Sequence, residues 1–239
     1  MLLTDSPRFE IKRFVGGPLL TTCYALIVPG KESIIIDAPR DAWKGAIAAA
    51  DERNAPVQLA LATHGHWDHV TDMAKMRAMG YRTAGHPADS GLFANPMAGR
   101  AGLPFVIEPV RIDQRLADGD HLSIGGIDIL ILHTPGHTAG SVCLWIAGEE
   151  ILFTGDTLLK GGAGYLERPE SDSLALATSI RRLAEFPSAT TLYPGHGAPT
   201  TIAEETWLED AQDPDTLVRY WKAGQRRWKP PGGGINEEI

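Results

Sequence analysis

The sequence has little cysteine and no long hydrophobic run. Its two cysteines, Cys23 and Cys143, both lie inside apolar segments, which is typical of small buried side chains in a reducing compartment rather than of a disulfide or a ligand pair. No apolar stretch approaches the roughly 18 residues of a membrane span. The N-terminus also lacks a basic region followed by an apolar stretch, so no secretory signal is indicated. We therefore expect a cytoplasmic protein with no membrane partner.

The sequence also lacks positive charge. It has 22 Lys and Arg against 30 Asp and Glu, a formal net charge of -8 and a pI of about 5.5. Nucleic-acid partners usually require a basic surface, so none is expected here. With 239 residues and 43% hydrophobic residues, the chain can bury a full core. This balance favours a globular protein that acts on small molecules.

Apolar strands and amphipathic helices alternate in two blocks along the chain. Strands are predicted over residues 9–14, 22–28, 33–37, 57–62, 127–132, 141–146, 150–153 and 190–193. Helices are predicted over 41–53, over 68–80 with Met73, Met76 and Met79 in the core, and over 172–185 with Ser171 or Asp172 as the cap. Two blocks of strands with helices predict two sheets packed together with helices outside. The domain is expected to cover 1–210, with an extension over 211–239.

Four residues of the types that bind metal ions lie within six positions, directly after the apolar strand at 57–62. They are His64, His66, Asp68 and His69. A strand brings the chain to the edge of a sheet, and the turn after it can direct several side chains to one point. Imidazole and carboxylate groups bind zinc, iron or manganese. Four such groups exceed the need of one tetrahedral ion with an open position, so the turn indicates two ions.

Three further residues of the same types follow predicted strands. His137 lies in Thr-Pro-Gly-His-Thr, Asp156 in Thr-Gly-Asp-Thr and His196 in Pro-Gly-His-Gly. The neighbouring glycines are typical of sharp turns that bring the backbone close to a crowded site. One histidine at a strand end is most often a packed or solvated residue. Seven residues in the same setting predict a metal site.

The pattern His64-x-His66-x-Asp68-His69, followed by His137, Asp156 and His196, resembles the metallo-β-lactamase fold superfamily. The phrases TPGHTAGS, LFTGDTLLKGG and LYPGHG resemble glyoxalase II (hydroxyacylglutathione hydrolase) and its smaller relatives. The resemblance implies an α/β fold, an αββα sandwich of two mixed β-sheets flanked by helices. It also implies two divalent metal ions, zinc in the first place and iron or manganese as alternatives. His64, His66 and His137 would bind one ion, Asp68, His69 and His196 the other, and Asp156 would bridge them.

Such a site implies metal-dependent hydrolysis of an ester or thioester bond. A hydroxide that bridges the two ions would attack the carbonyl carbon of a small-molecule acyl substrate. A thioester suits the site because a thiolate leaves without a strong general acid. Asp68 is the candidate catalytic residue, because it could orient the hydroxide and move its proton in addition to binding metal.

The chain departs from glyoxalase II in the segment after Asp156. That family typically has Lys or Arg where this chain has Tyr165, and an aromatic residue where it has Glu167. Only about 40 residues follow the last ligand motif, so we expect the dedicated glutathione-binding domain of that family to be reduced here. We therefore expect the same type of reaction as in glyoxalase II, whereas the thiol half of the substrate is left open. Tyr165 is a candidate substrate-binding residue, with a packing role as the alternative.

Other functions share much of this ligand set. Lactonases of the acyl-homoserine type share all seven ligands and stay open. Persulfide dioxygenases use one iron and usually carry Ala-His-Asp where this chain has Gly-His-Gly around His196. β-Lactamases of this fold typically lack the bridging Asp156. Metal-dependent nucleases share the ligands, but the acidic balance of the chain disfavours them.

Aromatic residues outside the ligand motifs have structural interpretations. Trp67, between two ligands, is expected to pack at the rim of the site. The apolar residues of 93–105 would line an acyl pocket or close the edge of the core. Four aromatic residues near the C-terminus would dock a terminal helix or form a homodimer contact; they are Trp207, Tyr220, Trp221 and Trp228.

Overall fold

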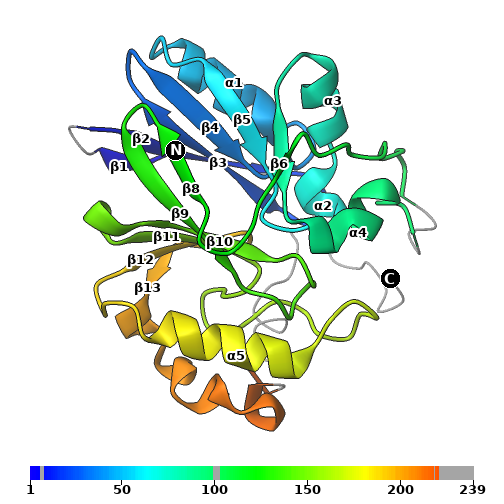
Figure 1. The fold of residues 1–239 in the computed structure, drawn as a ribbon, viewed down its shortest axis with the longest axis vertical. Helices are drawn as coiled ribbons and strands as arrows, with labels where there is room; N and C mark the ends of the chain where they lie inside the picture. The colour runs from blue at the N-terminus through cyan, green and yellow to red at the C-terminus, as the bar shows by residue number, and fades with distance from the viewer. Residues whose placement is uncertain (6–7, 99–102, 218, 221–239) are drawn as a thin grey trace. The chain divides into compact units, whose positions relative to one another are not determined.

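The computed structural model describes residues 1–5, 8–98, 103–217 and 219–220. These residues form two compact units (Figure 1). The first unit contains Met1–Ala84 and Ser90–Gln114, and the second contains Gly85–Asp89 and the described residues from Arg115 onward. Among the described residues, none of the helices is both long enough and apolar enough to cross a bilayer.

The first unit is built on a seven-stranded mixed sheet with the strands in chain order. The pairs β1–β2, β2–β3 and β3–β4 are antiparallel, whereas the pairs β4–β5 and β5–β6 are parallel. The strands are β1 (Leu2–Asp5), β2 (Glu10–Gly16), β3 (Thr21–Val28), β4 (Glu32–Ile36), β5 (Val57–Leu61), β6 (Thr83–Gly85) and β7 (Gln114–Arg115). The four strands predicted in this half of the sequence are all present, whereas the short strands β1, β6 and β7 were not predicted.

Helix α1 (Ala42–Asp51) covers one face of this sheet. Its small side chains lie against the β3 residues Cys23, Ala25 and Ile27, so that helix and sheet approach closely. Both cysteines of the chain are free and fully buried. Burial raises the pKa of the Cys23 thiol and raises that of Cys143 to about 11, so both stay protonated and unreactive, as expected of buried hydrophobic residues.

The helix predicted over 68–80 is two shorter helices, α2 (Trp67–Val70) and α3 (Met73–Ala78), followed later by α4 (Ser90–Ala94). The break falls at Asp72, which has a non-helical backbone. Its buried carboxylate accepts hydrogen bonds from the Asp41 amide and the Trp43 indole. Met73 and Met76 are buried as predicted, but Met79 lies beyond α3 and is 62% exposed, so its predicted core position is wrong.

The second unit is built on a six-stranded mixed sheet in the order β13-β12-β11-β10-β9-β8. Neighbouring strands are antiparallel except β11 and β12, which run parallel. The strands are β8 (His121–Ile124), β9 (Ile127–His133), β10 (Val142–Ile146), β11 (Ile151–Gly155), β12 (Thr191–Pro194) and β13 (Thr200–Thr201). Of these, β8 and β13 were not predicted. Short 3-10 helices cover Pro87–Asp89, Ala147–Glu149, Ile202–Glu204, Thr206–Leu208 and Asp210–Gln212.

Helix α5 (Ser173–Ala184) packs on this second sheet (Figure 1). Asp172 caps its N-terminus by accepting a 3.0 Å hydrogen bond from the Ala175 amide, as the sequence suggested. Trp207 belongs to the same hydrophobic core and its ring lies 5.5 Å from that of Tyr220. These two aromatic residues therefore dock on the second unit, whereas Trp221 and Trp228 lie outside the described residues.

The parallel strand pairs set the positions of the candidate ligands. In each unit, two parallel neighbours end at the same edge of the sheet, where the carboxyl ends of strands commonly form binding sites. The segments after β4 and β5 carry Asp37 and His64, and those after β11 and β12 carry Asp156 and His196. Parallel pairing therefore brings residues from distant parts of the sequence to one sheet edge.

Candidate metal-binding site

The first group of candidate ligands occupies the turn after β5 and the start of α2. His66 has an extended backbone and precedes α2, which places Asp68 and His69 in the first turn of the helix. His64 Nε2 lies 3.1 Å from His66 Nδ1, and the rings of His64 and His69 have centroids 4.1 Å apart. All four side chains are buried. The turn therefore gathers three imidazoles and a carboxylate, as the sequence predicts.

A buried carboxylate orients His69 from the neighbouring parallel strand. Asp37 Oδ2 lies 2.7 Å from His69 Nδ1 and accepts a second hydrogen bond from the Thr63 hydroxyl, while Oδ1 accepts one from the Thr63 amide. Because His69 Nδ1 is held by Asp37, Nε2 faces Asp68, whose Oδ2 lies 3.5 Å away. A carboxylate behind a histidine is the arrangement that fixes metal-binding imidazoles. Sequence reasoning had assigned Asp37 only to the end of a strand.

The Asp68 side chain is held by a threonine that lies 47 positions earlier in the sequence. The Thr21 hydroxyl at the start of β3 donates a 2.7 Å hydrogen bond to Asp68 Oδ2, and both residues are buried. This oxygen is the one that lies near His69 Nε2. The hydrogen bond therefore fixes the rotamer of the predicted catalytic carboxylate.

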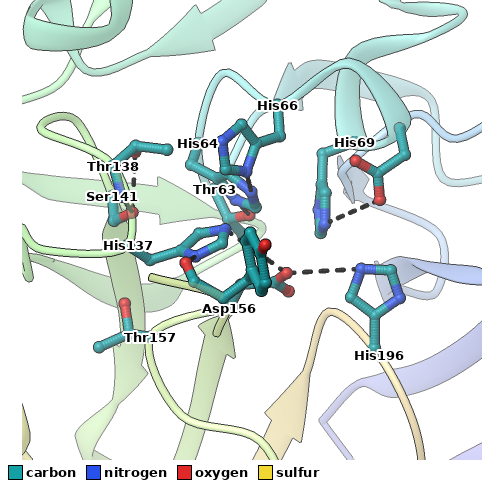
Figure 2. A network of polar contacts seen from close by, with 12 residues as sticks. Thr63, His64, His66, His69, His137, Thr138, Ser141, Asp156, Thr157 and His196 are labelled. Atoms are coloured by element: carbon teal, nitrogen blue, oxygen red, sulfur yellow. Dashed lines mark hydrogen bonds and ion pairs between the residues drawn. The ribbon is translucent and has the colours of Figure 1, made fainter. Parts of the chain in front are cut away.

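The second group of candidate ligands surrounds one carboxylate oxygen in the second unit. Asp156 Oδ2 lies 3.6 Å from His137 Nε2 and 3.4 Å from His196 Nε2 (Figure 2). The three residues follow β9, β11 and β12. His137 and Asp156 are buried, and the side chain of His196 is 12% exposed. One carboxylate thus lies between two imidazole nitrogens.

The imidazole of His137 is fixed from behind by main chain. Its Nδ1 lies 2.9 Å from the carbonyl oxygen of Tyr165, and the Ser171 hydroxyl donates to both the His137 and Tyr165 carbonyls. Gly164 makes this packing possible, because a Cβ there would lie 2.3 Å from the Asp156 carbonyl oxygen and 2.6 Å from His137 Nδ1. A side chain at position 164 would push the histidine and the aspartate from their places.

Three histidine rings are held in the same way, by a hydrogen bond at Nδ1, and this arrangement suits metal binding. In His64, His69 and His137, Nδ1 is hydrogen-bonded to Thr63, Asp37 and the Tyr165 carbonyl respectively. In each, Nε2 is then turned toward another candidate ligand atom, between 3.1 and 3.6 Å away. Imidazole nitrogens and carboxylate oxygens this close together in a buried setting fit a divalent cation. As ligands, these nitrogen and oxygen atoms suit zinc, iron or manganese.

Comparison with known proteins agrees with this chemistry. The model of the Metallo-beta-lactamase superfamily matches residues 16–196, which include all seven candidate ligands. The chain belongs to this superfamily. The predicted fold class, two mixed β-sheets flanked by helices, is thereby confirmed. The chain is a hydrolase of the superfamily type, and its buried histidines and aspartates are compatible with divalent metals.

Three relatives of the superfamily are informative. A hydroxyacylglutathione hydrolase of Cereibacter sphaeroides is 34% identical over 209 residues, covering 86% of this chain and 74% of that protein. The crystal structure of BLEG-1 B3 metallo-beta-lactamase has a TM-score of 0.74 and 27% identity, covering 83% of this chain and 99% of that one. The crystal structure of TTHA1623 in a di-iron-bound form has a TM-score of 0.70 and 30% identity, covering 81% and 96%.

A buried aspartate supports the loop after β9, which carries His137. Asp89 accepts hydrogen bonds of 2.7 Å from the Thr138 hydroxyl and from the Gly140 amide. The Thr138 hydroxyl also lies 2.9 Å from that of Ser141 (Figure 2). Gly140 has no space for a side chain, because a Cβ would lie 2.6 Å from the Asp89 carboxyl carbon. Sequence reasoning missed Asp89, which lies in a segment that looked irregular.

A buried glutamate holds the loop that follows Asp156. Glu205 accepts a 2.6 Å hydrogen bond from the Gly161 amide, and the Thr200 hydroxyl and Trp207 indole donate to it as well. Gly161 belongs to a turn closed by reciprocal hydrogen bonds between Leu159 and Gly162. Two residues later, the Gly164 amide bonds to the Asp156 carbonyl. Glu205 thus ties the loop between Asp156 and Tyr165 to the chain beyond the last candidate ligand.

The side chain of Tyr165, the predicted substrate-binding residue, is partly exposed, whereas its main-chain carbonyl contacts His137. Its hydroxyl donates a 3.0 Å hydrogen bond to Glu167, and the Arg168 guanidinium lies 5.6 Å from the ring centroid. Desolvation, with the Glu167 hydrogen bond and charge, raises the pKa of the phenol. The hydroxyl therefore stays a hydrogen-bond donor at neutral pH. The two positions where this chain departs from glyoxalase II, Tyr165 and Glu167, contact each other.

Proposed function

We propose that the chain is a thioester hydrolase that works with two divalent cations. The observation that carries this proposal is the shared orientation of His64, His69 and His137, each held at Nδ1 with Nε2 turned toward another candidate ligand atom. A histidine held at Nδ1 in this way presents the Nε2 lone pair as a metal ligand. Membership of the superfamily supports the same interpretation.

In this proposal the two groups of ligands act as one dinuclear site. His64, His66 and His137 would hold one cation, Asp68, His69 and His196 would hold the other, and Asp156 would contribute to both. Zinc is the first candidate, and the di-iron form of TTHA1623, a relative at 30% identity, supports iron as the alternative. The cations would supply Lewis-acid activation of water and of the scissile carbonyl.

The chain's own residues would position and move the proton. Asp68, fixed by the Thr21 hydroxyl, is proposed to orient the attacking water and accept its proton. The candidate ligands His64, His69 and His137 are nearly or fully buried, at 2% exposure or less, so their charge interactions are weakly screened. A thioester is the preferred substrate because the thiolate leaves without a proton donor.

The relative from Cereibacter sphaeroides, a hydroxyacylglutathione hydrolase, supports an acyl thioester as the substrate class. Tyr165 is proposed to contact the substrate beside His137, with its phenol as the hydrogen-bond donor. Because the Tyr165 hydroxyl is paired with Glu167, a substrate oxygen would have to replace the Glu167 carboxylate. This exchange would favour an anionic or strongly polar acceptor.

The test combines metal analysis of the purified protein with a hydrolysis screen of thioesters, lactones and a β-lactam. Two equivalents of metal, thioester turnover, its loss on chelation and its return with added metal are the expected results. Full turnover by metal-stripped protein would overturn the proposal, and turnover of lactones alone would replace the thioester by a lactone.

A pair of histidine variants provides the matched control. His137→Ala is expected to lose metal and activity together. His121→Ala should keep both, because His121 is an exposed residue paired with Asp128 on the surface of the same unit. Equal losses in the two variants would show that the effect is not specific to the proposed ligands.

A further inference from the structure

The loop after β4 has a constrained backbone. Asp37 and Asp41 both have left-handed conformations, with φ of 59° and 65°, and Pro39 lies between them. Such a conformation is unfavourable for a residue other than glycine and persists only where the surrounding structure enforces it, and residues of this kind cluster at functional sites. The strain at Asp37 is explained by its contact with His69. The amide of Asp41, directly after Arg40, donates a 2.8 Å hydrogen bond to the buried Asp72 carboxylate.

Main-chain contacts hold this loop against the candidate ligand turn. The Ala38 amide donates a 2.7 Å hydrogen bond to the His69 carbonyl, and the Asp72 amide donates to the Ala38 carbonyl. On the other side, Gly16 approaches so closely that a Cβ there would lie 2.2 Å from the Arg40 carbonyl oxygen. The backbone around Arg40 is therefore fixed from two sides, because Ala38 contacts His69 and the Arg40 carbonyl lies against Gly16.

The Arg40 side chain lies on an aromatic ring that contacts the same turn. Its guanidinium carbon is 4.3 Å from the centroid of Phe105, and the Phe105 ring lies 6.4 Å from the ring of Trp67. Trp67 is the residue between the candidate ligands His66 and Asp68. Arg40 is thus connected to the ligand turn by the main chain of its own loop, and Phe105 is connected to it through Trp67.

Apart from the Arg40–Asp41 pair, the exposed part of this cluster is apolar. The Arg40 side chain is 42% exposed, and its Nε lies 3.6 Å from the Asp41 carboxylate. Val106 is 79% exposed, and Leu103 and Phe105 are half-buried. An arginine held flat on a ring keeps the edge of its planar fork available for two parallel hydrogen bonds to a carboxylate.

We propose that Arg40 and Phe105 form a recognition site for a carboxylate at the non-reacting end of the substrate. The guanidinium binds the carboxylate, and Phe105 with Val106 contacts the carbon chain that joins it to the reacting group. This inference rests on the proposed thioester hydrolysis and narrows it to acidic thioesters. The carboxylate can belong to the acyl half or to the thiol half of the substrate.

Two matched pairs of thioesters distinguish these sources. For the acyl half, S-succinyl-N-acetylcysteamine is compared with S-butyryl-N-acetylcysteamine, which lacks the terminal carboxylate. For the thiol half, N,S-diacetylcysteine is compared with N,S-diacetylcysteamine. Arg40→Gln is expected to raise KM at least about tenfold for the acidic member of one pair with little change in kcat, and to leave the neutral members within about twofold.

Control variants separate recognition from packing. Arg82→Gln removes another arginine of the same unit, which is hydrogen-bonded to Gln114 on the surface, and should leave all four substrates unchanged. Phe105→Leu keeps an apolar side chain but removes the ring, and should raise KM for the same acidic substrate as Arg40→Gln. Equal losses on acidic and neutral thioesters, with a lowered melting temperature, would show a packing role and overturn the inference.

Failure of the proposed function has a different signature. If the wild-type protein hydrolyses none of the four thioesters, the proposed function fails and the same compounds serve as ligands in calorimetry. Tighter binding of an acidic member than of its neutral partner, abolished by Arg40→Gln, would then support the recognition site. Equal binding within each pair, or no binding at all, would overturn it.

Discussion

The two units supply candidate ligands in contrasting ways. In the first unit, His64, His66, Asp68 and His69 come from one turn and the short helix after it. In the second, His137, Asp156 and His196 follow three different strands, β9, β11 and β12, and meet only because these strands belong to one sheet, in which β11 and β12 are neighbours and β10 lies between β9 and β11. The first group is thus set by local backbone, and the second by the sheet.

This difference is repeated in the residues that support the ligands. The first group depends on two side chains from neighbouring strands, Asp37 and Thr21. The second depends on main-chain contacts in loops, where Gly164 approaches His137 and where Asp89 and Glu205 hold amides. We therefore expect the first group to respond to changes in charge and the second to changes in shape.

The largest effect is expected from Asp156→Ala, because its carboxylate lies near two histidines of the second group. Metal content should fall from two ions toward one or none, and kcat/KM for a thioester should fall by about 10³-fold, in the range of losing one principal electrostatic group. Metal analysis and steady-state kinetics provide the readout. Two ions still bound in the variant would contradict the bridging role.

A smaller effect is expected from Asp37→Asn in the first group. The amide is a poorer acceptor for His69 Nδ1, so metal affinity should fall by about 10- to 100-fold while the fold is kept. The control is Asp128→Asn, which changes a similar aspartate–histidine pair that is exposed on the surface. Competition with a chelator measures both variants. An unchanged affinity in Asp37→Asn would remove Asp37 from the site.

Gly164→Ala tests the dependence of the second group on shape. The added methyl group would overlap the Asp156 carbonyl and the His137 ring, so unfolding free energy should fall by about 1–3 kcal/mol and metal content should fall with it. Gly148→Ala is the matched control, since a Cβ there meets nothing within 4 Å. Denaturant unfolding and metal analysis provide the comparison. Equal stability of the two variants would argue against the close packing.

The smallest effect is expected from Glu205→Gln, which keeps an acceptor oxygen but turns an NH2 group toward a donor. A loss of about 1 kcal/mol in unfolding free energy is expected, at the lower end of the cost of an unsatisfied buried group, with raised KM if the loop from Asp156 to Tyr165 shifts. Glu52→Gln is the control, because the Glu52 side chain is 67% exposed and its ion-pair partner, Arg53, belongs to the first unit. Should both variants behave like the wild type, Glu205 would have no part in holding the loop.

Much of the fold could be predicted from the sequence, because it depends on local patterns, and the seven candidate ligands could be named from local motifs, whereas their binding of metal stays a prediction. The apolar runs that become β3, β4, β5 and β11 are continuous and are bounded by turn residues. The residues that support the ligands could not be predicted in the same way. Asp37 and Thr21 are separated from their partners by 32 and 47 positions, so no local spacing connects them with the site.

Two predicted details were changed by tertiary contacts. The helical pattern over 68–80 is interrupted because Asp72 satisfies the Trp43 indole and the Asp41 amide instead of continuing the helix. The irregular segment after β6 contains Asp89, whose function is visible only once β6 and the loop after β9 are both in place. In both cases the competing partner lies in another element of the same unit.

The contact between Glu205 and Gly161 has a consequence for how the loop folds while the chain is being synthesised. Translation completes the last candidate ligand at His196, nine positions before Glu205 is added. A nascent chain can therefore hold every ligand while the Gly161 amide still lacks its acceptor. The final shape of the loop beside Asp156 is set by a residue that emerges after all the ligands.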